Sequence, residues 1–153
     1  MTVTTTYDAL DIAKKVISMT NTEQGDSITN LKLQKLLYYL QGFWLAVYDR
    51  PLFDEEIEAW MYGPVVPRVY EAYKQYGKQA IPVEDDNEVL QLNTEDEEDL
   101  FNEVYNTFNR YSASALVMMT HEEKPWLSCK TIGAGSVISR EEMKEFFKTK
   151  VNA

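Results

Sequence analysis

The chain has 153 residues, 44% of them hydrophobic, and a formal net charge of -10, which fits one domain with its own core. The acidic balance argues against binding to nucleic acid, because most of that affinity comes from basic groups on phosphates. A single cysteine excludes an internal disulfide, and neither a signal peptide nor a run of eighteen apolar residues occurs, so we expect a cytoplasmic protein with no membrane contact.

The first predicted helix follows Asp8, whose carboxylate is suited to cap a helix N-terminus. After it, Ala9, Ile12, Ala13, Val16 and Ile17 recur at helical spacing and form one apolar stripe. The stripe ends in the polar run N-T-E-Q-G-D, which is typical of a loop.

The segment from Ile28 to Tyr48 is the predicted central helix, because it is apolar around most of its circumference. Thr29 is placed to cap it, and Ile28 is placed to pack on Leu33 as a hydrophobic staple. Gly42 lowers helix propensity by about 1 kcal/mol relative to alanine, so we interpret it as the site of a close helix crossing.

Lys32, Lys35 and Tyr39 come round together on the flank of this helix. Two readings stay open for the flank. It is either a surface that contacts a partner, or a place where lysine stems cover the core while the ammonium groups reach water.

From Glu56 to Tyr62 the side chains partly alternate, which predicts a short strand with Trp60 and Tyr62 on one face. A short helix starting at Asp54 fits the same residues. The Gly63-Pro64 pair predicts a turn. Pro67 is suited to the first position of a helix that ends at Gly77.

The acidity is concentrated between residues 79 and 109, which hold ten acidic residues and no lysine or arginine. We predict strands over residues 80–83 and 89–92, and then a helix whose capping box is T-E-D-E, from Thr94 to Glu97. The stretch is either a surface that steers a basic partner or a segment that keeps the protein in solution.

In the last third, Ser112 is expected to cap a short helix that runs through Met119, and the run T-H-E-E-K-P-W-L-S-C-K is expected to be a loop. Ser139 starts the capping box of a final helix. The predicted fold is therefore mainly α (α+β): a single compact domain of about six helices around a central hydrophobic helix, with a small β-sheet or hairpin.

The residues offer no set of catalytic groups. His121 is the only histidine and Cys129 the only cysteine, and the run H-E-E-K lacks the second histidine of a zinc-binding helix. We therefore predict no catalytic residue, no metal and no cofactor. Ten tyrosines and three tryptophans favour a binding protein instead, since these residues dominate protein interfaces.

Three blocks of the sequence resemble the Panacea domain family of SocA-like antitoxins: L-K-L-Q-K-L-L-Y-Y-L-Q-G, A-W-M-Y-G-P-V and T-H-E-E-K-P-W. The resemblance covers nearly the whole chain and implies one such domain over residues 1–153. It implies a toxin-antitoxin protein, often carried by a prophage, that neutralises a cognate toxin by binding it. The alternatives are an adaptor that delivers the toxin to a protease and an orphan phage protein that binds a host factor.

The resemblance also marks positions. The flank and the aromatic strand face are the predicted partner-binding residues: Lys32, Lys35, Tyr39, Trp60 and Tyr62. The other motif positions are expected either to hold the scaffold or to contact the partner: Gly63, Pro64, His121, Pro125 and Trp126.

Overall fold

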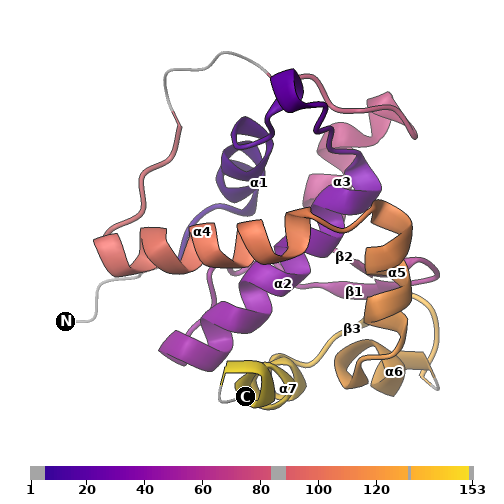
Figure 1. Cartoon of the computed structure of the whole chain (residues 1–153). Helices are drawn as coiled ribbons and strands as arrows, with labels where there is room; N and C mark the ends of the chain where they lie inside the picture. Colours follow the sequence, from indigo (N-terminus) through magenta and orange to yellow (C-terminus); the bar gives the residue numbers. More distant parts are fainter. Residues whose placement is uncertain (1–5, 84–88, 131, 152–153) are drawn as a thin grey trace.

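The structure is a computed structural model that describes residues 6–83, 89–130 and 132–151. In these ranges, seven α-helices and one three-stranded antiparallel sheet pack together, with α2 (Asn30–Tyr48) in the middle. Figure 1 shows α4 (Glu95–Asn109) crossing α2, with α1 (Ala9–Ser18) and the sheet beside it. The predicted class is confirmed: a mainly helical single domain with a small sheet.

The caps predicted for the first two helices are confirmed. The Asp8 carboxylate accepts a hydrogen bond from the Leu10 amide at 2.8 Å, and the Thr29 hydroxyl accepts one from the Lys32 amide at 3.2 Å. At its other end, α2 stops at Asp49, which has the left-handed φ of 59°. Between these ends α2 is buried on nearly every side, as its apolar circumference predicts.

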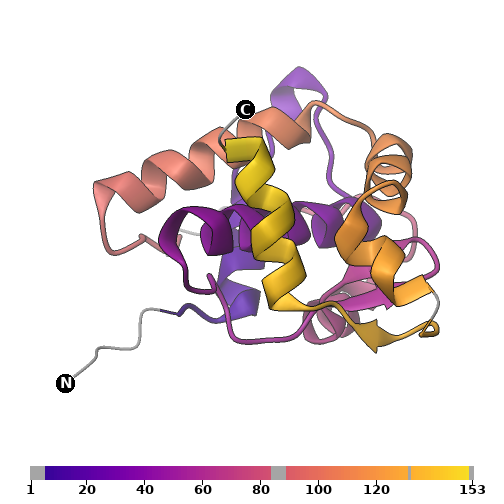
Figure 2. The same ribbon diagram turned by 90° about the horizontal axis from the view of Figure 1, so that it is seen from below.

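The predicted close crossing at Gly42 is present. Figure 2 shows α7 (Arg140–Val151) lying across α2, and the ring of Phe147 fills the notch that the missing side chain leaves. A Cβ added to Gly42 would stand 2.1 Å from that ring. Phe147 is itself 1% exposed, so this contact closes one side of the core.

The sheet is a hairpin of β1 (Glu58–Trp60) and β2 (Gly63–Val65), with β3 (Ser136–Val137) on the other side of β1. Trp60 pairs with Gly63, so the tight turn consists of Met61 and Tyr62. The strand prediction over residues 56–62 is confirmed in its middle. The turn predicted at Gly63-Pro64 is wrong, because both residues belong to β2.

Pro67 begins α3 (Pro67–Tyr73) as predicted, and a 3₁₀ turn (Lys74–Tyr76) carries the chain to Gly77. The strands predicted over 80–83 and 89–92 are absent from the described residues. Ala80 makes an isolated bridge with Thr29, and the Ile81 amide donates to the Ile28 carbonyl at 2.7 Å. One bridge of this kind holds the segment, but a strand needs a neighbouring strand edge along its length.

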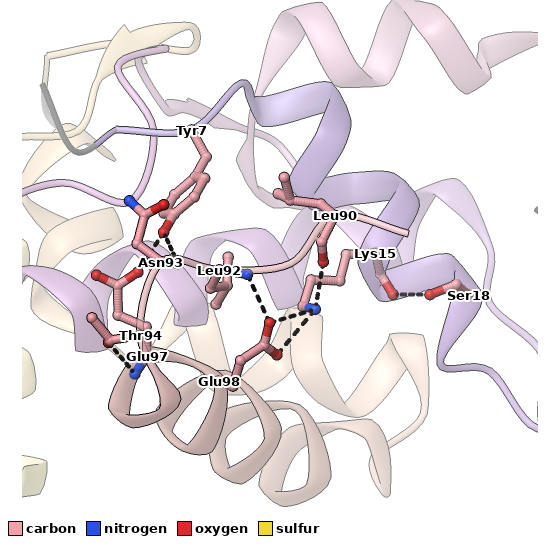
Figure 3. A network of polar contacts seen from close by, with 9 residues as sticks. All are labelled: Tyr7, Lys15, Ser18, Leu90, Leu92, Asn93, Thr94, Glu97 and Glu98. Atoms are coloured by element: carbon pink, nitrogen blue, oxygen red, sulfur yellow. Dashed lines mark hydrogen bonds and ion pairs between the residues drawn. The ribbon is translucent and has the colours of Figure 1, made fainter. Parts of the chain in front are cut away.

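The start of α4 is fixed to α1 by a buried lysine (Figure 3). The Lys15 ammonium donates to the Leu90 carbonyl at 2.8 Å and forms an ion pair with Glu98 at 3.1 Å. Glu98 in turn accepts from the Leu92 amide at 2.7 Å. Lys15 is only 7% exposed, so a charge removed from water is compensated by one carboxylate and one carbonyl.

Thr94 caps α4 as predicted, since its hydroxyl accepts from the Glu97 amide at 3.1 Å. The Glu97 carboxylate, however, accepts from the Tyr7 hydroxyl at 2.5 Å and pairs with Arg50 at 2.6 Å. Burial and the hydrogen bond to Glu97 raise the pKa of Tyr7 to about 12. Glu97 is 2% exposed and links the chain before α1, the loop after α2 and α4.

The predicted cap Ser112 begins α5 (Ala113–His121), and Ser139 caps α7, its hydroxyl accepting from the Glu142 amide at 3.2 Å. The prediction of a loop for this run is wrong except at Glu122 and Glu123, because α5 continues to His121. Residues Lys124–Lys130 form α6, whose first turn is closed by the Leu127 amide donating to the Glu123 carbonyl at 3.0 Å. Pro125 is compatible with that first turn, because its missing N–H is not needed there.

Candidate partner-binding surface

The second lysine of the L-K-L-Q-K motif lies inside the protein. Lys35 is 0% exposed, and its ammonium donates to the Pro64 carbonyl at 3.1 Å. Burial lowers the pKa of Lys35 to about 7. Gly63 has a φ of +108°, and a Cβ there would stand 2.6 Å from Lys35 Cε and 2.8 Å from the Thr120 hydroxyl. The glycine and lysine motifs therefore fit each other: the hairpin approaches α2 closely because position 63 has no side chain.

Two motif tyrosines share one carboxylate. Glu123, between α5 and α6, accepts hydrogen bonds from Tyr38 at 3.0 Å and Tyr39 at 2.9 Å. Burial raises the pKa of Glu123 to about 7, and burial beside Glu123 also raises the pKa of both tyrosines. Tyr39 stacks on Phe108 of α4 with ring centroids 3.9 Å apart. The pair thus ties α2 to α4 and to the α5–α6 corner.

Sequence reasoning missed Glu123. Its only signal was its position inside the motif T-H-E-E-K-P-W, where the histidine and the tryptophan drew attention. No spacing rule relates residue 123 to tyrosines 84 and 85 residues earlier.

The histidine-tryptophan motif holds the hairpin from the other side. The Trp126 indole donates to the Trp60 carbonyl at 2.9 Å, and the His121 ring stacks on Trp126 at 4.1 Å. The Trp60 indole donates to Glu58 at 3.0 Å, and its ring meets the edge of Tyr70 at 5.0 Å. The motif blocks, far apart in sequence, therefore converge on one hairpin.

The predicted flank of α2 does not form an exposed surface. Lys35 is 0% and Tyr39 1% exposed, whereas Lys32 is half-buried and its ammonium donates to the Asn109 carbonyl at the end of α4 at 2.7 Å. Lys35 is covered by Gly63 and the hairpin, and Tyr39 is covered by Phe108. Whether any of the three contacts a partner stays a prediction, but in this structure two of them lie below the surface.

The hairpin turn is where the motif region reaches the surface. Met61 is 72% and Tyr62 63% exposed. Beside the turn, a hollow of about 250 Å³ lies between β1, α6 and the loop before β3, with Trp60, Met61 and Trp126 in its wall.

We call the surface formed by Trp60, Met61, Tyr62 and Trp126 the hairpin face. Of the predicted partner-binding residues, Trp60 and Tyr62 belong to it. Of the other motif positions, Trp126 lies in it, Gly63 and Pro64 lie against Lys35 beneath it, and His121 stacks on Trp126. Pro125 is buried in α6.

The chemistry of this region is that of packing and hydrogen bonding. No group of three histidine, cysteine or acidic residues that could hold a metal ion occurs in the part of the chain that the structure describes. Cys129 is 3% exposed, its thiol lies 3.6 Å from the Val137 carbonyl, and burial raises its pKa, which disfavours the nucleophilic thiolate. The absence of catalysis stays a prediction.

Comparison with known proteins gives a family. Residues 33–127 match the model of the "Antitoxin SocA-like, Panacea domain" family, which is more than half of the chain. The chain belongs to the SocA-like Panacea family. The resemblance stated from the motifs is thereby confirmed. Antitoxin SocA from Caulobacter vibrioides (strain NA1000 / CB15N) is 46% identical over 54 residues, which are 35% of this chain and 29% of that protein. The chain thus aligns with less than a third of that relative's length, and no solved structure matches it.

The Panacea match contains the converging motif residues but not the whole core. It includes Lys35, Gly63 and Trp126 and stops before α7, whose Phe147 fills the notch at Gly42. None of the helices in the described ranges has the length and apolar character needed to span a membrane.

Proposed function

We propose that this protein is an antitoxin that neutralises a protein toxin by binding it directly, and that residues 1–153 form the single Panacea domain that does so. Membership of the SocA-like antitoxin family supports the general role. The name of the similar protein, Antitoxin SocA, agrees with it over 54 aligned residues. In this proposal the buried motif residues Lys35 and Tyr39 position the scaffold, and the toxin contacts the hairpin face.

The observation that carries the contact proposal is the exposure of two large side chains on a firmly held turn. Met61 and Tyr62 are mostly exposed, while the strands on either side are tied down by the Trp126–Trp60 and Lys35–Pro64 hydrogen bonds. Aromatic and methionine side chains are enriched at the centres of interfaces. A preorganised turn also loses little conformational entropy on binding.

The test uses the protein encoded by the neighbouring gene as the toxin. That protein is expressed alone and together with this one, and growth arrest and rescue are measured; the dissociation constant of the purified pair is then determined. Met61→Asp places a charge in the centre of the hairpin face. We expect it to weaken binding about 30-fold or more and to abolish rescue, since losing a buried apolar anchor typically costs above about 2 kcal/mol.

Val89→Asp is the matched control, because it introduces the same charge at an exposed valine beside α4. Val89 does not line the hollow beside the hairpin turn. It is expected to bind and rescue as the unchanged protein does. Thermal melts of both variants verify that they remain folded. The proposal is wrong if Met61→Asp binds normally, or if the neighbouring protein does not arrest growth and does not bind.

A further inference from the structure

A second apolar hollow lies on another part of the surface, between α2, α4 and α7, and has a volume of about 250 Å³. Its apolar lining includes Val47 from α2, Leu100 and Val104 from α4, and Val151 from α7. Val47 and Val151 are each 44% exposed. We call this hollow the α4 groove. Its floor is a place where apolar side chains from three helices face water together.

One wall of the α4 groove is acidic. At about 100° per residue, Asp96, Asp99 and Glu103 fall within roughly 60° of the α4 circumference, next to the groove-lining Leu100 and Thr107. Glu103 itself lines the groove, and all three acids are exposed. Burial is the largest cause of the raised pKa of Tyr48, and the negative charges of Glu97, Asp96 and Asp99 add to it. Asp96 and Asp99 therefore lie near the end of α2 that carries Val47.

These three acids differ from Glu97 and Glu98, which lie between them in sequence, in forming no ion pair among the described residues. Glu97 pairs with Arg50 and Glu98 with Lys15, whereas no ion pair joins Asp96, Asp99 or Glu103 to another residue of the described chain. The opposite wall holds one lysine, Lys150, whose ammonium lies 5.2 Å from the Phe146 ring centroid on its own helix. The groove therefore combines an apolar floor with an uncompensated negative wall.

We propose that the α4 groove binds a cationic amphipathic helix of a partner protein. Such a helix presents apolar residues at i, i+3, i+4 and i+7, which fit a groove between helices, and its lysines or arginines fall beside that stripe. Here they would meet Asp96, Asp99 and Glu103. The surrounding charge strengthens the match, because residues 79–109 hold ten acids and no base and attract a basic segment over long range. The proposal does not depend on the hairpin face.

The test uses a fluorescein-labelled 18-residue helical peptide of leucine, lysine and alanine, with its leucines on one face. A scrambled peptide of the same composition has no apolar face. Thr107→Arg places a bulky cation in the groove, and Thr107 is exposed, so the variant is expected to fold. Ser114→Arg is the matched control: it makes the same charge change at an exposed position on α5, which does not line the groove.

We expect fluorescence anisotropy to show that Thr107→Arg weakens binding of the amphipathic peptide at least tenfold. Ser114→Arg should change it less than threefold, and the scrambled peptide should bind at least tenfold more weakly to the unchanged protein. Equal loss in both variants, unchanged binding to Thr107→Arg, or equal affinity for the two peptides overturns the proposal. Sedimentation of the protein alone gives a further check: a dimer that Thr107→Arg converts to a monomer would mean that a second copy occupies the groove, and would also overturn it.

Discussion

Replacing Lys35 with methionine should remove a pH dependence of stability that its burial creates. The Lys35 pKa is about 7 in the folded protein and about 10.5 in the unfolded chain, so the unfolded chain binds more protons between these values. Stability therefore rises with pH across this window. Each pH unit well above pH 7 contributes about 1.4 kcal/mol, and the slope at pH 7 itself is half of that, which gives roughly 2.3 kcal/mol between pH 7 and 9.

Lys35→Met keeps an unbranched buried side chain that is one atom shorter, and it removes the charge. Below pH 7 we expect the variant to be more stable than the unchanged protein, because no ammonium has to be kept out of water. The gain is reduced by about 1 to 3 kcal/mol, because the Pro64 carbonyl loses the donor that stands 3.1 Å away.

Urea denaturation at pH 6, 7, 8 and 9 measures the difference between variant and unchanged protein. Taking that difference cancels the titration of other groups to first order. Lys14→Met, at an exposed lysine, is the control and should keep the pH dependence of the unchanged protein. A difference curve for Lys35→Met that stays flat from pH 7 to 9 would refute the reasoning, since it would mean that the ammonium reaches water in the folded state.

Glu123→Gln should show the opposite dependence. The pKa of Glu123 is raised to about 7 from 4.5, so between these values the folded protein binds more protons than the unfolded chain, and its free energy of unfolding falls by roughly 3.4 kcal/mol as the pH rises through them. The same urea denaturation should show that the variant lacks this fall. Parallel stability curves for the variant and the unchanged protein would contradict the prediction. Gly42→Ala should lower the free energy of unfolding by about 1 to 3 kcal/mol, because its methyl group meets Phe147. Combining it with Phe147→Leu should cost less than the sum of the two single changes, and strict additivity would argue against the contact.

The parts of the fold that could be predicted from the sequence are those that depend on residues close together in the chain. The caps at Thr29, Thr94, Ser112 and Ser139 each depend on one side chain and the backbone amide three residues later, and all four form. The notch at Gly42 was also readable, because a glycine inside an apolar helix has few other uses.

The parts that failed depend on partners distant in sequence. A helical wheel places Lys35 and Tyr39 on one flank but does not say what covers it, and the covering comes from Gly63 and Phe108. Helix α6 was missed because seven residues are too few to show an apolar period. The strands expected over residues 80–83 and 89–92 lack a sheet edge to join, which no local pattern reveals.

For the candidate site, the sequence identified the motif residues but not how far each of them is buried. It placed Trp60 and Tyr62 on one strand face, whereas Tyr62 lies in the turn and is far more exposed than the half-buried Trp60. Met61 was assigned to the opposite side, away from the predicted contacts, because strict alternation was extended into a turn where alternation ends.

The seating of Phe147 at Gly42 has a consequence for anyone who isolates the recurrent part of this family. The family match spans residues 33–127, yet Met143 and Phe147 beyond it, and Ile12 and Val16 before it, are each 0% or 1% exposed. A fragment limited to residues 33–127 would expose to water the apolar surfaces of α2 that α1 and α7 cover. The segment that matches the family is thus smaller than the unit that shares one core, so deletion experiments should preserve both flanking helices.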